Sequence, residues 1–66
     1  MNDVINRYKD CMEMVFEKKY GIDKSVSRQW IKEFNFDYIL NETDNFAMHD
    51  DPEEWVDIIY EYNTFN

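Results

Sequence analysis

Residues 3–21, DVINRYKDCMEMVFEKKYG, carry the clearest structural pattern in the chain. Their apolar residues recur at the spacing of a helix and form one stripe: Val4, Ile5, Tyr8, Cys11, Met12, Val15 and Phe16. Asn2 or Asp3 can cap the beginning of this helix, and Gly21 can adopt the left-handed conformation that ends it. Such a stripe is stable only when it is buried, so the sequence predicts an amphipathic helix packed against other elements.

A second helix is predicted from its N-cap, Asp23, to about Asn35. One line of it is apolar: Val26, Trp30 and Phe34, with Ile31 alongside. A neighbouring line is basic, with Lys24, Arg28 and Lys32 at a spacing of four. We therefore expect an amphipathic helix with a basic face.

The first residues of the last helix predict where it begins. Asp51 is the expected N-cap, Pro52 occupies the first helical position, and Glu54 stands where a capping box places its acid. Four apolar residues then follow at i, i+3, i+4 and i+7 and are expected to form one buried stripe: Trp55, Ile58, Ile59 and Tyr62.

The segment between the second and last helices supports two interpretations. Some residues fit the spacing of a helix: Phe36, Ile39, Leu40 and Thr43. Others alternate as in a short strand: Phe36, Tyr38 and Leu40. Turn-forming residues follow: Asn41, Asp44 and Asn45. We expect a short helical turn and then a loop. Residues 1–66 are thus predicted to form a single all-α domain, a small three-helix bundle with either a short fourth helical turn or a strand in residues 36–48.

Composition agrees with a small helical domain. The chain has 66 residues, of which 44% are hydrophobic and only one is Gly. Tight β-hairpin turns need more Gly than this, so an all-β fold is not expected. A domain of this size buries only about 60% of its unfolded surface, and its aromatic residues partly offset this because each buries roughly 150–250 Å².

No targeting or membrane-spanning segment is expected. Met1 to Arg7 lack the apolar core of a signal peptide, and no apolar run approaches the ~20 residues that span a bilayer. Cys11 is a single cysteine, whereas small secreted domains usually need several. The abundance of Asn, Lys, Ile, Phe and Tyr suits an AT-rich genome. We therefore expect a cytoplasmic protein of a bacterial or phage-infected cell, without a membrane partner.

The charges are divided between the two halves of the chain. The net charge is −8, and Lys32 is the last basic residue. Only acids follow it: Glu33, Asp37, Glu42, Asp44, Asp50, Asp51, Glu53, Glu54, Asp57 and Glu61. A one-sided field of this kind indicates a positively charged binding partner.

A row of acids runs along the last helix. Asp50, Glu54, Asp57 and Glu61 are spaced by four, three and four residues, which places them on one helix face. Like charges at such spacing cost about 0.2–0.5 kcal/mol per pair. The helix dipole compensates for acids near the N-terminus, but Asp57 and Glu61 lie toward the other end, with no basic residue near them in sequence.

Two explanations of this row remain open. Acids on an exposed face keep a small, aromatic-rich domain soluble and monomeric. Alternatively, a rigid row of carboxylates takes the place of phosphates in a basic groove that binds nucleic acid. The expected partner-binding residues are then Asp44, Asp50, Glu54, Asp57 and Glu61. Nearby aromatic residues can add strong contacts, although core packing is their commoner use: Tyr60, Tyr62 and Phe65.

Residues 20–30, YGIDKSVSRQW, resemble the turn and recognition helix of transposase-like helix-turn-helix domains. The match rests on the turn glycine, the apolar residue after it and a later buried aromatic: Gly21, Ile22 and Trp30. The resemblance implies groove-facing residues at Lys24, Ser25, Ser27 and Arg28. Glu17 and Ser27 depart from the pattern, since they replace a small residue and a buried aliphatic one. The net charge of −8 also opposes phosphate binding.

Other chemistries have little support in the sequence. His49, Asp50 and Asp51 follow Asp44 in one segment, but the alternating acids and central Gly of an EF-hand are missing, so no metal is expected. Cys11 lies on the apolar stripe of the first helix and is expected to be a buried, inert thiol. Without a Gly-rich loop to hold a phosphate, we expect neither an enzyme nor a cofactor.

The sequence therefore predicts a non-enzymatic acidic binding protein, an inhibitor that blocks the basic nucleic-acid-binding surface of a larger protein. In size and charge alone it looks like the small acidic nuclease inhibitors made by phages, including anti-CRISPR proteins. Two alternatives stay open: a small helix-turn-helix DNA-binding regulator that uses residues 21–34, and an antitoxin or immunity-type protein. Direct binding to nucleic acid is expected only for the helix-turn-helix alternative.

Overall fold

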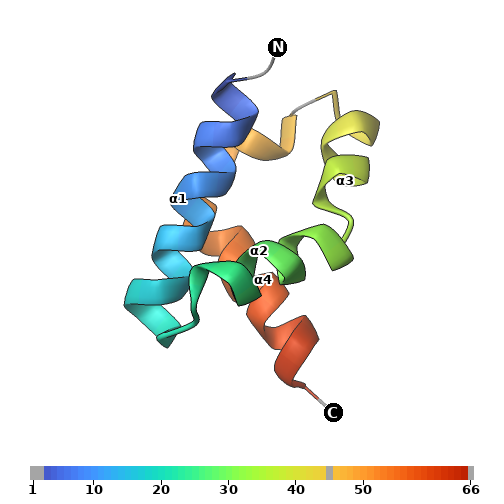
Figure 1. The fold of residues 1–66 in the computed structure, drawn as a ribbon. Helices are drawn as coiled ribbons and strands as arrows, with labels where there is room; N and C mark the ends of the chain where they lie inside the picture. The colour runs from blue at the N-terminus through green and yellow to red at the C-terminus, as the bar shows by residue number, and fades with distance from the viewer. Residues whose placement is uncertain (1–2, 45, 66) are drawn as a thin grey trace.

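The computed structural model describes residues 3–44 and 46–65. Helical segments follow one another along the chain (Figure 1): α1 (Asp3–Tyr20), α2 (Lys24–Glu33), α3 (Phe36–Glu42), the short 3₁₀ helix η1 (Phe46–His49) and α4 (Pro52–Thr64). The described residues contain no strand, so the all-α prediction is confirmed and the strand interpretation of residues 36–48 is wrong. The helical interpretation of this segment is realised as α3, with η1 after it.

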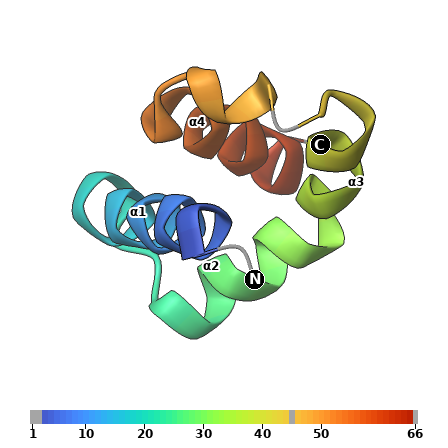
Figure 2. The same cartoon turned by 90° about the horizontal axis from the view of Figure 1, so that it is seen from above.

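The helices are arranged so that the last one returns beside the first. α1 packs most extensively against α4 and then against α2, while α3 joins α2 to η1 (Figure 2). Three residues link α1 to α2, and two residues link α2 to α3. The chain thus turns away from α1 through α2 and α3, and η1 brings it back to the start of α4.

The core lies where these helices meet. Its buried residues are Met12, Phe16, Ile31, Phe36, Leu40, Ala47, Val56 and Ile59. Aromatic rings extend it: Phe16 meets Trp30 edge to face with 5.9 Å between ring centroids, and Tyr20 stacks on Tyr60 at 3.7 Å. Burying each large apolar side chain stabilises the fold by roughly 1.5–3 kcal/mol. This packing offsets the small size of the domain.

Residues close in sequence set the helix ends. Gly21 has a φ of 68°, and its amide donates to the Glu17 carbonyl, which ends α1 where predicted. Asp23 caps α2 by accepting a hydrogen bond from the Ser25 amide at 3.1 Å. Asn35, with a φ of 65°, makes the turn from α2 into α3.

α4 also begins where predicted, with Asp51 at the N-cap and Pro52 in the first helical position. The Asp51 side chain makes no capping hydrogen bond, so the expected capping box is not formed. Instead, the Glu54 amide donates to the Asp51 carbonyl at 3.0 Å.

The buried face of α1 is rotated from the predicted stripe. Cys11 is exposed, whereas Met12, Phe16 and the neighbouring Glu13 are buried. The face turns toward Glu13 because Arg28 of α2 neutralises that carboxylate, which allows it to leave water. The prediction of a buried Cys11 thiol is therefore wrong.

The predicted apolar stripe of α4 is shifted as well. Ile59 is buried as expected and Val56 with it, but Ile58 and Tyr62 are 46% and 66% exposed. Tyr60 takes their place in the packing, because its ring stacks against the end of α1. α4 consequently presents two large apolar side chains to solvent.

Candidate functional site

Four of the five acids expected to bind a partner are exposed: Asp44, Asp50, Glu54 and Glu61. Among residues 3–44 and 46–65, no Lys or Arg forms an ion pair with any of them. Asp44 and Asp50 lie on either side of η1, and Glu54 and Glu61 lie about two turns apart on α4. These side chains present negative charge that the described part of the fold does not neutralise.

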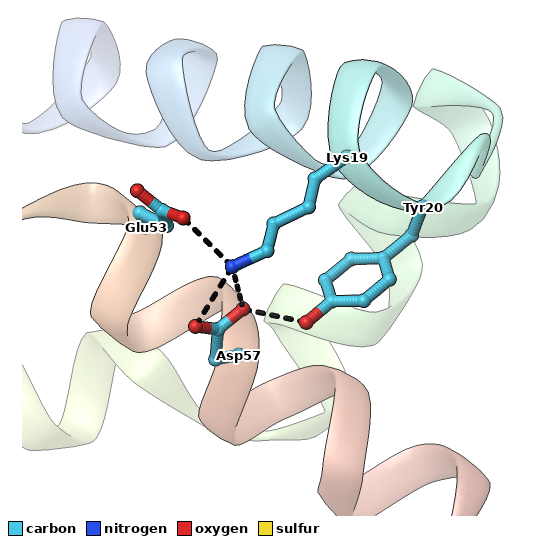
Figure 3. A network of polar contacts seen from close by, with 4 residues as sticks. All are labelled: Lys19, Tyr20, Glu53 and Asp57. Atoms are coloured by element: carbon cyan, nitrogen blue, oxygen red, sulfur yellow. Dashed lines mark hydrogen bonds and ion pairs between the residues drawn. The ribbon is translucent and has the colours of Figure 1, made fainter.

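Asp57 differs from them because it faces α1 (Figure 3). Nζ of Lys19 lies 2.9 Å and 3.1 Å from the two carboxylate oxygens of Asp57, and 2.7 Å from Oε2 of Glu53. The Tyr20 hydroxyl donates to Oδ1 of Asp57 at 2.6 Å. We call these four residues, Lys19, Tyr20, Glu53 and Asp57, the α1–α4 clamp.

The clamp gives Asp57 the positive partner that its neighbours in sequence do not provide. The hydrogen bond from Tyr20, followed by those from Lys19, holds the pKa of Asp57 below its ordinary value. The bonds to Glu53 and Asp57 in turn raise the pKa of Lys19. The Asp57 side chain is still 40% exposed, so solvent weakens the ion pair. The expectation that Asp57 lacks a compensating base holds along the chain but not in the fold.

α4 thus carries acids in two settings. Glu53 and Asp57 turn toward α1 and share Lys19. Glu54 and Glu61 are exposed and have no ion pair within the described residues. Packing of α4 on α1 pairs Glu53 and Asp57 with Lys19, whereas no Lys or Arg of the described residues pairs with Glu54 or Glu61.

The segment that carries Asp50 is held by α1. The Tyr8 hydroxyl donates to the backbone carbonyl of Asp50 at 2.7 Å, and the Tyr8 ring stacks on Phe36. Desolvation, followed by the charges of Asp50, Asp51 and Glu54, raises the pKa of Tyr8 to about 12. The acids at the start of α4 therefore act together as a region of negative potential.

An apolar hollow lies at the other end of α4, beside Glu61. Its lining residues are Phe34, Ile58, Glu61, Tyr62, Thr64 and Phe65. Phe65 is 83% exposed, and the Tyr62 ring meets Phe34 edge to face at 5.4 Å. We call the apolar members, Phe34, Ile58, Tyr62 and Phe65, the α4 apolar patch.

Sequence reasoning found this patch only in part. The spacing of Ile58 and Tyr62 fits a buried stripe and therefore predicts core positions for both. The available signal was the crowding of aromatic residues near the acidic row. Of these, Tyr62 and Phe65 are exposed, whereas Tyr60 is partly buried.

The fold exposes only some of the residues that the helix-turn-helix resemblance implies for DNA contact. Lys24, Ser25 and Arg28 are exposed on α2. Ser27 is 0% exposed and its hydroxyl donates to the Lys24 carbonyl at 3.0 Å, so it does not face outward. Arg28 is engaged with the carboxylate of Glu13. A DNA-reading role for α2 would therefore have to disturb an ion pair that supports its packing on α1.

His49 was the candidate metal ligand closest to the acids of residues 50–51. The His49 ring stacks on Phe46 with 4.7 Å between centroids. Among the residues that the structure describes, no three His, Cys, Asp or Glu side chains gather closely enough to hold a metal ion. In the same part of the chain, no helix is both long enough and apolar enough to cross a bilayer.

Comparison of the chain with models of protein families, with curated proteins and with solved structures found no match.

Proposed function

We propose that this chain is a non-enzymatic binding protein that occupies a basic, nucleic-acid-binding surface of a larger protein and thereby inhibits it. The observation that carries the proposal is the separation of acids on α4. In the clamp, Glu53 and Asp57 share the positive charge of Lys19, while Glu54 and Glu61 stay exposed without an ion pair in the described residues. We call the proposed contact surface the acidic face; it consists of Asp44, Asp50, Glu54 and Glu61, with Asp57 at its inner edge.

Electrostatics favours this use over a general solubilising role. Solubility requires charge somewhere on the surface, and mixed charges serve it well. Here the charges of one sign are concentrated on one helix and the segment before it, which raises the rate of encounter with a basic groove. The helix also fixes the spacing of Glu54 and Glu61, so less conformational freedom is lost on binding than in a flexible loop.

Competition with nucleic acid tests the proposal. The tagged chain is used to capture proteins from a bacterial lysate, and each captured protein is then titrated with labelled DNA or RNA with the chain present or absent. We expect the chain to displace the nucleic acid, and less effectively as salt rises, because exposed charges are screened within about 10 Å at 0.1 M. Captured proteins whose nucleic-acid binding is unaffected by the chain would refute the proposal.

The informative variant combines Glu54→Lys with Glu61→Lys. Both side chains are exposed and unpaired in the described residues, so the change breaks no packing contact or ion pair there. Asp57→Lys would instead set two cations together in the clamp and confuse binding with folding. The matched control combines Asp10→Lys with Glu17→Lys, two exposed acids of α1, which changes the net charge equally. We expect the first variant to lose competition and the control to keep most of it.

The alternatives predict other outcomes. An antitoxin or immunity-type protein would use the same acidic face, but its partner would be a toxin nuclease encoded beside it. A helix-turn-helix regulator would bind duplex DNA directly through Lys24 and Arg28. A mobility shift with DNA that is abolished by Arg28→Ala, in a variant shown to remain folded, would replace the proposal with this second function.

A further inference from the structure

Three members of the α4 apolar patch are exposed, Ile58, Tyr62 and Phe65, although α4 also buries other apolar residues. Ile58 and Tyr62 lie one turn apart on the exposed side of α4 and Phe65 follows just past its end, while Val56 and Ile59 fill the core. Soluble monomers rarely expose contiguous apolar patches larger than a few hundred Å², and such patches often bind a partner. Exposed Tyr and Phe side chains in such a patch are the types that give strong contacts in protein interfaces.

The charges beside the patch restrict what can cover it. Glu61 is the charged residue in the lining of the hollow, and Glu54 lies one turn before Ile58 on α4. The lining contains no Lys or Arg within the described residues. A second copy bound symmetrically through the same patch would bring acids against acids, and each copy carries a net charge of −8. Charge complementarity therefore argues against self-association and for a basic occupant.

We propose that the patch is the docking site for a basic amphipathic helix of the partner protein. Apolar side chains of that helix would fill the hollow between Tyr62 and Phe65, and its flanking Lys or Arg residues would pair with Glu54 and Glu61. The inference rests on the proposed function and deepens it. It specifies that an apolar contact, and not charge alone, fixes where the partner binds.

A synthetic peptide supplies the probe. It is a helix with Leu on one face, at i, i+3, i+4 and i+7, and Lys at the other positions. Two control peptides separate the contributions: one with the same residues in an order that scatters the leucines, and an oligolysine of equal charge. Each is titrated into the isotope-labelled chain at about 0.15 M salt, where charge screening acts over about 8 Å, and binding is followed by NMR chemical shifts.

The amphipathic peptide is expected to shift the amide signals of residues 58–65 and to bind at least roughly fivefold more tightly than either control, a difference of about 1 kcal/mol. Phe65→Ala and Tyr62→Ala should each weaken it by a similar factor. Phe46→Ala is the matched control, because Phe46 is a 68% exposed aromatic residue outside the patch. That variant should bind as the unmodified chain does.

Equal binding of all three peptides, or shifts that lie away from α4, would overturn the inference. Sedimentation velocity tests whether a second copy of the chain binds the patch instead. A dimer that Phe65→Ala disrupts would show that it does. If oligolysine binds equally well and Glu54→Lys with Glu61→Lys removes its binding, the acidic face stands and only the apolar docking fails. If the patch binds the amphipathic peptide but nucleic-acid competition fails, the docking site stands without the proposed function.

Discussion

Arg28 of α2 donates two hydrogen bonds to the carboxylate of Glu13 on α1, from Nε at 3.0 Å and from Nη2 at 3.3 Å. Glu13 is only 5% exposed, whereas the arginine side chain lies largely in solvent. A carboxylate leaves water at little cost only when a positive group compensates for the lost hydration. This contact therefore helps to fix the rotation of α1 about its axis.

Arg28→Ala is expected to lower the midpoint of thermal unfolding by several degrees. The variant leaves the buried Glu13 carboxylate without its partner, and a small domain has little stability to lose. Glu13→Leu, added to Arg28→Ala, should recover most of the loss because an apolar side chain needs no partner there. Circular dichroism melts of the two single variants and the double variant form the test. Simple additivity of the two changes would contradict the coupling.

Ser27→Ala is expected to be neutral or to raise the free energy of unfolding by up to about 0.5 kcal/mol, since Ala is the better helix former. Ser27 lies fully within the packing of α2, where its hydroxyl bonds only to the helix's own backbone. Ser27→Leu should instead destabilise by about 1–3 kcal/mol through overpacking. Urea unfolding measures both variants. A fully tolerated leucine would show that this side of α2 is not buried.

Alkaline unfolding should depend on Tyr8. Its pKa is raised from 10.0 to about 12 in the fold, because burial and nearby carboxylates disfavour the phenolate. The protonated Tyr8 hydroxyl contributes fully to the stability of the fold below about pH 10. This contribution is lost as the pH rises from about 10 to about 12, because the unfolded chain releases the Tyr8 proton at a lower pH than the folded chain does. Tyr8→Phe cannot ionise, so its stability deficit should narrow across this range. Urea titrations at neutral pH and in that alkaline window compare the variants, and a constant deficit would contradict the assignment.

Glu61→Lys is expected to raise the free energy of unfolding by about 0.3–1 kcal/mol while it weakens partner binding. A cation near the C-terminal end of a helix interacts favourably with the helix dipole, and an anion there does not. Glu53→Lys is the contrasting control, because it places a second cation against Lys19 and should lower stability. Chemical unfolding at low salt measures both. A loss of stability in Glu61→Lys would mean that Glu61 serves the fold.

Helix ends were predictable because they depend on residues that are neighbours in sequence. Gly21, Asp23 and Pro52 each set a boundary close to where local rules place it. The rotation of the helices was not predictable in the same way. A hydrophobic pattern counts Glu13 as a surface residue, and only the approach of Arg28 from another helix allows it to be buried.

The candidate site could also be predicted only in part, because contacts between helices decide some of it. The exposure of Glu54 and Glu61 follows from their charge and from the lack of a nearby base in sequence. The pairing of Asp57 does not, since Lys19 and Tyr20 precede it by more than thirty residues and meet it only through packing of α1 on α4. The α4 apolar patch was hidden by the same rotation, because Ile58 and Tyr62 have the spacing of core residues.

The division of charge between the helices also has a consequence for motion in solution. All seven basic residues belong to α1 and α2, and Lys19 is the one whose ion pairs reach α4 in the described structure. The molecule therefore has a permanent electric dipole moment between its two sides. In the field of a basic surface, this moment exerts a torque that turns α4 forward before any atoms touch. Orientation during approach would speed association at low salt, while the lifetime of the complex would depend on the short-range contacts made afterwards.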